Sequence, residues 1–153
     1  MWLTAQRDIV ASAVSKRLFA RAAKAPVVVD SGLEERVAAL LARRCAELLG
    51  LARRAGLVRA GFMKVKEALA KGGVAALVEA TDGAADGRAK LGKLPPGLIM
   101  VSCLSAAELG AALGRDHAVH VALKTGPLTD SLIAEARRLA GFRAGAKVDV
   151  SDR

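Results

Sequence analysis

The chain has 153 residues, 53% of them hydrophobic, and its 24 Lys and Arg against 15 Asp and Glu give a formal net charge of +9. This composition is too apolar for an intrinsically disordered chain, and glycine follows no three-residue period, which excludes a collagen-like one. The length suits one domain of ordinary size, which can bury a core without a disulfide or a metal.

The excess of basic residues constrains the partners of the chain. A pI near 10.3 is typical of a small domain that binds nucleic acid, because each phosphate that a cation neutralises releases counterions. The simpler interpretation is that the charge only keeps the domain soluble and monomeric. We expect RNA or DNA as the partner.

Three features predict a cytoplasmic protein. Cys45 and Cys103 form no Cys-x-x-Cys pair and are typical of buried thiols in a reducing compartment. Arg7 and Asp8 interrupt the first apolar run, which excludes a secretory signal. Nowhere do 18 consecutive apolar residues occur, so we expect no membrane span.

The first predicted elements are helical. A helix starts at Thr4 as N-cap, and Pro26 ends it before the extended run 27–29. A domain boundary falls between Pro26 and Ser31. Ser31 and Glu34 have capping-box spacing and open a helix of about 24 residues that ends at Gly56.

From residue 57 the pattern alternates between strands and helices. Apolar runs predict strands at 57–58, 74–80, 98–103 and 118–123, and helices at 61–71, 84–91, after Ser105, and 128–140. Ser105 and Glu108 form a second capping-box pair, and Asp82 is the expected cap of helix 84–91. Apolar strands separated by such helices predict an α/β fold with helices on both faces of the sheet. Residues 146–153 are predicted to be a flexible tail.

Motifs for catalysis and metal binding are missing from the sequence. His117 and His120 fall on opposite faces of a strand, so we expect one exposed and one core-facing histidine rather than metal ligands. Asp82 and Asp86 could bind a cation, but helix capping explains Asp82 more simply. No nucleophile–base pair can be named, and we predict no enzyme, no cofactor and no metal. A small-molecule enzyme with a pocket near Asp82 and Gly83 ranks last.

The basic residues gather around two loops. Gly61 opens a helix, and such a helix N-terminus offers unpaired N–H groups to phosphate. The run Lys124-Thr125-Gly126 ends the last predicted strand, where ligands often bind in α/β sheets. The alternative is a solvated helix face and an ordinary polar loop. Only four aromatic residues occur in the chain, so we expect no base-stacking platform.

Several segments together resemble a known family. They are LLGLARRA at 48–55, GFMKVKEALAKG at 61–72, LVEATDGAADGRAKL, the S-x-x-E-L-G-x-A-x-G stretch at 105–114, and AVHVALKTGPLTDSLIAEA. Over about residues 45–142 the chain resembles the ribosomal-protein superfamily that recognises kink-turn RNA, the archaeal "L-seven-Ae" type and its small bacterial relatives. The resemblance implies a three-layer α/β/α sandwich with a mixed four-stranded sheet, preceded here by the N-terminal helical segment.

The resemblance also implies where RNA binds. In the family, contacts come from the N-terminal end of the helix after a G-x-N-E-x-x-K signature and from the loop after the last strand. Gly61 is kept, whereas Met63, Lys64 and Glu67 stand where the family has Asn, Glu and Lys. Together with the basic residues that surround Gly61 and the loop at 124–126, this resemblance gives the predicted RNA-binding residues, which are Arg59, Gly61, Phe62, Met63, Lys64, Lys66, Lys71, Lys124, Thr125 and Gly126.

The N-terminal segment carries a second resemblance. KRLFARAAKAPV, at 16–27, is similar to the C-terminal half of bacterial YlxR-type proteins, a group proposed to bind RNA, although the G-R-G motif of that group is absent. We therefore divide the chain into residues 1–30, a helical segment and YlxR-type remnant, residues 31–145, the RNA-binding domain, and the tail.

These observations predict an RNA-binding protein that contacts ribosomal or other structured RNA through a basic helix N-terminus and the loop after the last strand. Association with the ribosome or with the transcription–translation machinery would follow. The alternative is a protein-interaction domain on the same scaffold that has lost specific kink-turn recognition.

Overall fold

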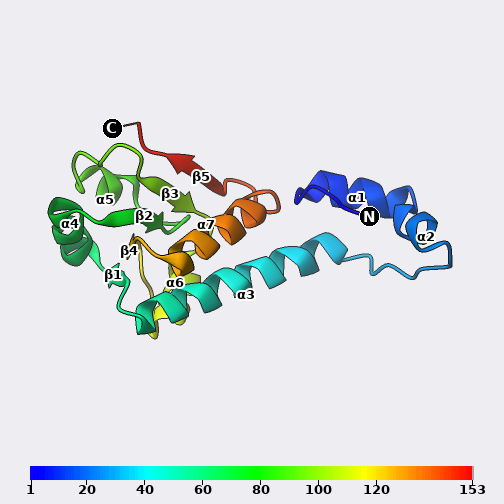
Figure 1. The fold of residues 1–153 in the computed structure, drawn as a ribbon, viewed down its shortest axis with the longest axis horizontal. Coiled ribbons are helices and arrows are strands. Elements are labelled where there is room, and N and C mark those ends of the chain that lie inside the picture. Colours follow the sequence, from blue (N-terminus) through cyan, green and yellow to red (C-terminus); the bar gives the residue numbers. More distant parts are fainter. Residues whose placement is uncertain (153) are drawn as a thin grey trace.

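A computed structural model describes residues 1–152 and shows a mixed α/β fold, which confirms the predicted class (Figure 1). Its elements are α1 (Arg7–Ser15), α2 (Leu18–Ala23), α3 (Leu33–Arg54), β1 (Val58–Ala60), α4 (Phe62–Lys71), β2 (Val74–Glu79), α5 (Ala85–Ala89), β3 (Ile99–Ser102), α6 (Ala106–Leu113), β4 (His120–Lys124), α7 (Pro127–Ala140) and β5 (Lys147–Val150).

The sheet has five strands in the order β1-β4-β2-β3-β5, so the prediction of four strands is wrong. Only β2 and β3 run parallel; the other neighbouring strands in this described part of the chain are antiparallel. The fifth strand lies in the segment that we expected to be a flexible tail. It pairs with β3 from Ile99↔Val150 to Ser102↔Lys147. Its KVDV sequence alternates polar and apolar residues, as a half-buried edge strand does, and Val148 packs on the core.

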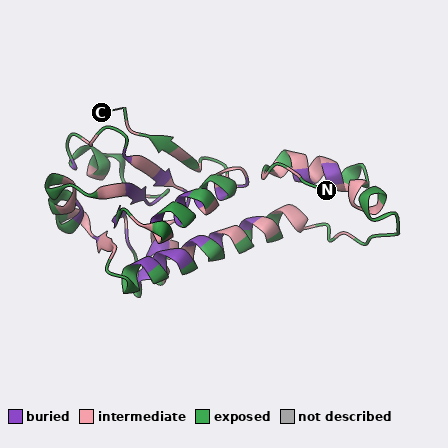
Figure 2. Cartoon of the chain, in the orientation of Figure 1, coloured by how far each residue is buried: buried purple, intermediate pink, exposed green. Residues whose placement is uncertain are grey.

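Successive residues of the central strands pack into different hydrophobic clusters. Ala76 and Val78 of β2 belong to a large cluster that includes residues of α3, α6 and α7. Leu77, between them, packs with Val65 of α4 and with Leu98. This alternation is the period of two that a strand imposes, and it requires apolar cover on each side. Buried positions gather in the sheet and along the second half of α3 (Figure 2).

The predicted N-terminal helix is interrupted. Arg17 adopts a left-handed conformation (φ 52°), which separates α1 from α2, and α1 starts after Gln6 rather than after Thr4. Val10 of α1 packs with Ala38 and Phe142, and Arg7 N–H donates to the Gly141 carbonyl at 2.9 Å. These contacts join the N-terminal segment to the first part of α3 and the end of α7 (Figure 1).

The capping predictions have different outcomes. The Ser105–Glu108 capping box forms and starts α6, as predicted. The Ser31–Glu34 box does not, because α3 begins after Gly32 with no side-chain cap. Asp82 caps α6 instead of α5: the Ala106 N–H donates to Asp82 Oδ1 at 2.8 Å. The loop after β2 thus holds the start of α6 through a contact 24 positions away in sequence, which local spacing could not indicate.

The remaining local predictions concern histidines and cysteines. His120 is buried and His117 is exposed, as expected. Cys45 and Cys103 are buried free thiols, and burial raises their pKa values to about 12 and about 11. Among the described residues, no group of His, Cys, Asp or Glu could hold a metal ion. No helix of residues 1–152 has the length and apolar character needed to cross a membrane.

Candidate functional site

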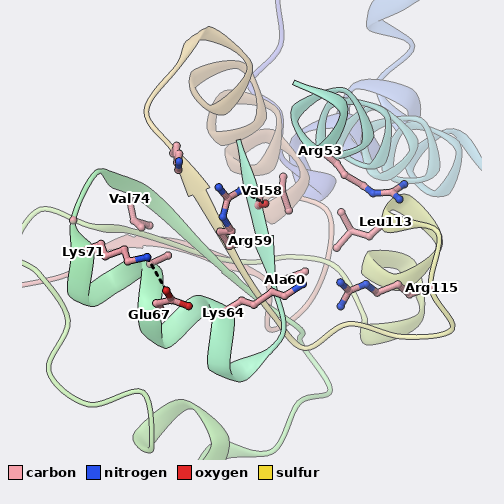
Figure 3. A pocket seen from close by; sticks show the side chains of 13 residues that line it. Arg53, Val58, Arg59, Ala60, Lys64, Glu67, Lys71, Val74, Leu113 and Arg115 are labelled. Atoms are coloured by element: carbon pink, nitrogen blue, oxygen red, sulfur yellow. Dashed lines mark hydrogen bonds and ion pairs between the residues drawn. The ribbon is translucent and has the colours of Figure 1, made fainter. Parts of the chain in front are cut away.

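A cavity of about 550 Å³ opens beside the edge strand β1, where six parts of the chain meet (Figure 3). The cavity lies between the end of α3, β1, α4, the start of β2, the end of α6 with the loop after it, and the end of β4. Its lining consists of Arg53, Val58, Arg59, Ala60, Lys64, Glu67, Ala68, Lys71, Gly72, Val74, Leu113, Arg115 and Lys124. We call this the cationic cavity.

The lining of the cationic cavity is strongly basic. Six of its residues are Lys or Arg and one is a carboxylate, which leaves an excess of five positive charges. The other residues are small or aliphatic, and none is aromatic. A cleft lined by charges of one sign with apolar walls concentrates the electric field, so this surface attracts anions more strongly than the same charges would on a convex face.

Gly61 sets the geometry of one wall. Its φ of +96° turns the chain sharply from β1 into α4, a conformation that side-chain-bearing residues rarely adopt. The Gly61 N–H donates to the His120 carbonyl on β4 at 3.0 Å, and the Gly61 carbonyl accepts the first helical hydrogen bond from Val65. Lys64 and Lys71 therefore project from α4 into the cavity beside β1 (Figure 3).

One lysine of the cationic cavity is already neutralised. Lys71 Nζ lies 2.7 Å from Glu67 Oε1, one helical turn away. The hydrogen bond from Lys71 lowers the pKa of the Glu67 carboxyl. Arg59 is held by the chain itself, because its Nη1 donates to the Val58 carbonyl at 2.9 Å. Arg59 forms no ion pair among the described residues, although its charge also acts on the nearby Glu67 carboxylate.

The other cations are available to a ligand. Within residues 1–152, four of them form no ion pair: Arg53, Lys64, Arg115 and Lys124. The Arg115 guanidinium lies beside the start of α4, since its Nη1 is 4.0 Å from the position that a β-carbon on Gly61 would occupy. The first-turn amides of α4 carry the positive end of the helix dipole at the same place.

The structure brings together part of the site predicted from sequence. Arg59, Lys64, Lys71 and Lys124 all line the cationic cavity, and Gly61 forms the turn at its edge. Lys66 lies outside the lining, with its Nζ 5.9 Å from the centroid of the Phe62 ring.

Four further predicted residues lie outside the cavity lining. Phe62 packs edge-on against His120, with 5.8 Å between ring centroids, and Met63 is 73% exposed to solvent. Thr125 N–H donates to the Gly73 carbonyl, and Gly126 lies against Leu57. These four residues shape the surroundings of the cavity rather than its wall.

Two cations of the cavity were missed by sequence reasoning. Arg53 lies near the end of α3, off its apolar stripe, where only its charge could have drawn notice. Arg115 follows Gly114, the left-handed C-cap of α6. Neither residue is near Gly61 in sequence. Both line the same cavity because the ends of α3 and α6 lie at the same edge of the sheet.

A buried pair of ionisable side chains, Glu79 and His120, lies next to the start of α4. His120 Nδ1 lies 2.5 Å from Glu79 Oε2, and the two residues face each other across β2 and β4. Burial raises the pKa of Glu79, and its other carboxylate oxygen has no hydrogen-bond partner among the described residues. Because His120 also contacts Phe62 and accepts from Gly61, the pair positions the start of α4.

Comparisons with known proteins identify a similar fold. No family model matches the chain, and no curated protein matches it. It is similar to a solved structure from Bacillus halodurans C, described as that of a protein with unknown function. The match has a TM-score of 0.52 and 24% sequence identity, and it covers 60% of this chain and 95% of the other. At this identity the similarity shows the fold alone.

Proposed function

We propose that this chain is an RNA-binding protein and that the cationic cavity is its phosphate-binding surface. The observation that carries the proposal is the excess of five positive charges around one concave surface, five of whose six cations form no ion pair among the described residues. The proposal includes the finer architecture that the resemblance implies, a three-layer sandwich of the kink-turn-binding type. Packing of α3 and α4 against opposite sets of strand residues supports it.

The chemistry of the lining favours recognition by charge and shape. Phosphate contacts release counterions and give strong, salt-sensitive affinity without reading bases. Arginine offers a planar fork that matches two phosphate oxygens, and three of the six cations are arginines. Since no aromatic residue lines the cavity, stacking of bases on aromatic rings does not contribute there.

Two residues that differ from the family signature, Met63 and Glu67, also agree with recognition by charge and shape. Met63 is exposed at the start of α4 and offers no hydrogen bond to a base edge. The Glu67 carboxylate forms an ion pair with Lys71. We propose that ribosomal or other structured RNA, including kinked RNA, is bound through its backbone geometry, with association to the ribosome or the transcription–translation machinery as the setting.

Gel-shift binding to two short RNAs tests the proposal. One RNA carries tandem G·A pairs that kink it, the other is a plain duplex, and each is measured at two salt concentrations. We expect binding that weakens steeply with salt. Stronger binding to the kinked RNA supports recognition of that shape, and equal binding supports a general RNA surface. Absence of binding to both at low salt contradicts the proposal and favours the protein-interaction domain instead.

A further inference from the structure

The concave shape of the cationic cavity restricts which phosphates can reach it. A double helix carries its phosphates on a convex surface, whereas the cations here surround a hollow of about 550 Å³. That volume lies in the range of small-molecule sites, about 300–1,000 Å³. A strand end fits such a hollow better than the side of a duplex does.

Two of the cations approach the cavity from different sides. The Arg115 guanidinium lies beside Gly61, the residue before α4, and Lys64 lines the same cavity from the first half of α4. Lys64 and Arg115 come from different elements and extend toward one another across the cavity (Figure 3). Unpartnered cations from separate elements form a site for an anion with several charged oxygens, rather than for single phosphodiesters spaced along a strand.

We propose that the cavity binds a group of linked phosphates, and specifically the 5′-triphosphate end of an RNA strand. This inference rests on the proposed function, because it takes RNA to be the molecule that carries the triphosphate. A terminal phosphate bears about 1.5–2 negative charges, against one for an internal phosphodiester, so the charge excess of the lining favours the end of the strand.

The neutral part of the lining agrees with this assignment. The aliphatic residues and the lack of aromatic rings provide no platform for a nucleobase, so the base next to the phosphates lies outside the cavity. Glu67 repels an anion and is paired with Lys71. The phosphates are therefore held on the Lys64 and Arg115 side of the cavity.

The test compares one single-stranded RNA sequence with a 5′-triphosphate or a 5′-hydroxyl, labelled at its 3′ end and titrated with the full chain by fluorescence anisotropy. We expect the triphosphate form to bind at least about tenfold more tightly. The variant Lys64→Gln/Arg115→Gln should reduce that preference to within about twofold. The matched variant Arg36→Gln/Lys93→Gln, which changes one exposed Arg and one exposed Lys elsewhere, should keep it. Circular dichroism confirms that each variant is folded.

Competition identifies the source of the phosphates. Inorganic tripolyphosphate should displace the triphosphorylated RNA at a lower concentration than orthophosphate does, and the opposite order would overturn the inference. Equal affinity of the wild-type chain for the two RNAs would overturn it and leave the proposed function standing. Binding of tripolyphosphate with no binding of either RNA would overturn both the assignment to an RNA end and the proposed RNA function, and would leave only a site for free linked phosphates.

Discussion

Glu67 is the carboxylate whose charge opposes a ligand in the cationic cavity. The hydrogen bond from Lys71 lowers its pKa further below neutral pH. Glu67→Gln removes one negative charge from the wall and frees Lys71, so RNA affinity should rise by about twofold to fivefold at low salt. Anisotropy titration measures this. Glu47→Gln, which breaks a similar pair with Arg43 away from the cavity, should change affinity less. An equal gain in both variants would show a general charge effect.

Glu108 links three segments through one carboxylate. Its oxygens accept from Arg143 Nη1 and Nη2, at 2.8 Å each, and from the Ser105 N–H. The hydrogen bond from Arg143 is the main cause that lowers the pKa of Glu108 below 4.5. A lowered folded-state pKa contributes stability that is complete above the unfolded-state pKa and is lost as the pH falls through the folded-state value.

The pH dependence of the Glu108→Gln variant checks this pair. We expect it to lower the free energy of unfolding by about 1 kcal/mol at pH 7, a value reduced for solvent screening because the side chain is 36% exposed. The loss should shrink as the pH falls below about 4.5. Urea unfolding at several pH values measures it. A constant difference from pH 7 down to pH 3 would contradict an ionic contribution.

Two serines with the same spacing to a glutamate allow a matched test of helix capping. The Ser105 hydroxyl accepts from the Glu108 N–H at the start of α6, whereas α3 starts at Gly32 without a side-chain cap. Ser105→Ala should therefore lower the free energy of unfolding by about 1 kcal/mol. Ser31→Ala should change it by less than about 0.5 kcal/mol. Thermal unfolding of both variants decides this, and equal effects would contradict the cap assignment.

The packing of α6 also depends on Gly110, which has no side chain. A β-carbon on Gly110 would lie 2.5 Å from the Cα of His117, where the chain returns from the helix toward β4. Gly110→Ala should destabilise the fold by about 1–3 kcal/mol, although alanine favours a helix. Chemical denaturation measures the change, and a variant as stable as the wild type would contradict this close approach.

Local patterns predicted the elements whose signals lie within a few residues. The apolar runs of β2, β3 and β4 and the periodic α3, α4 and α7 were recognisable because burial imposes the period of each element. The left-handed Arg17 was not, since a non-glycine residue in that conformation has no reliable sequence signal. The short strand β5 was assigned to a tail because four residues with two charges offer little apolar pattern.

At the scale of the whole molecule, the site depended on topology more than on motifs. Arg59, Lys64, Lys71 and Lys124 could be selected from sequence because they flank Gly61 or end a strand. Arg53 and Arg115 could not, because they join the others only after α3 and α6 pack beside β1. Charge selects candidate residues, whereas the packing of distant elements decides which of them face one ligand.

The N-terminal segment is attached through a small contact. A β-carbon on Gly141 would lie 2.0 Å from the Ala5 carbonyl, next to the hydrogen bond that Arg7 N–H donates to Gly141. Gly141→Ala should displace α1 and α2 while the sheet remains folded. Limited proteolysis measures this as faster cleavage between α2 and α3. Unchanged cleavage would contradict the docking of this segment.

The salt dependence of RNA binding tests the central claim most directly. The slope of log affinity against log salt counts the phosphates that the protein neutralises. Lys64→Glu/Lys124→Glu, in the cationic cavity, should weaken binding and reduce the slope by about one unit per lost phosphate contact. Arg36→Glu/Lys93→Glu makes the same charge change on exposed residues outside the cavity and should leave the slope nearly unchanged. A wild-type slope in the cavity variant would contradict the assignment of RNA phosphates to this cavity.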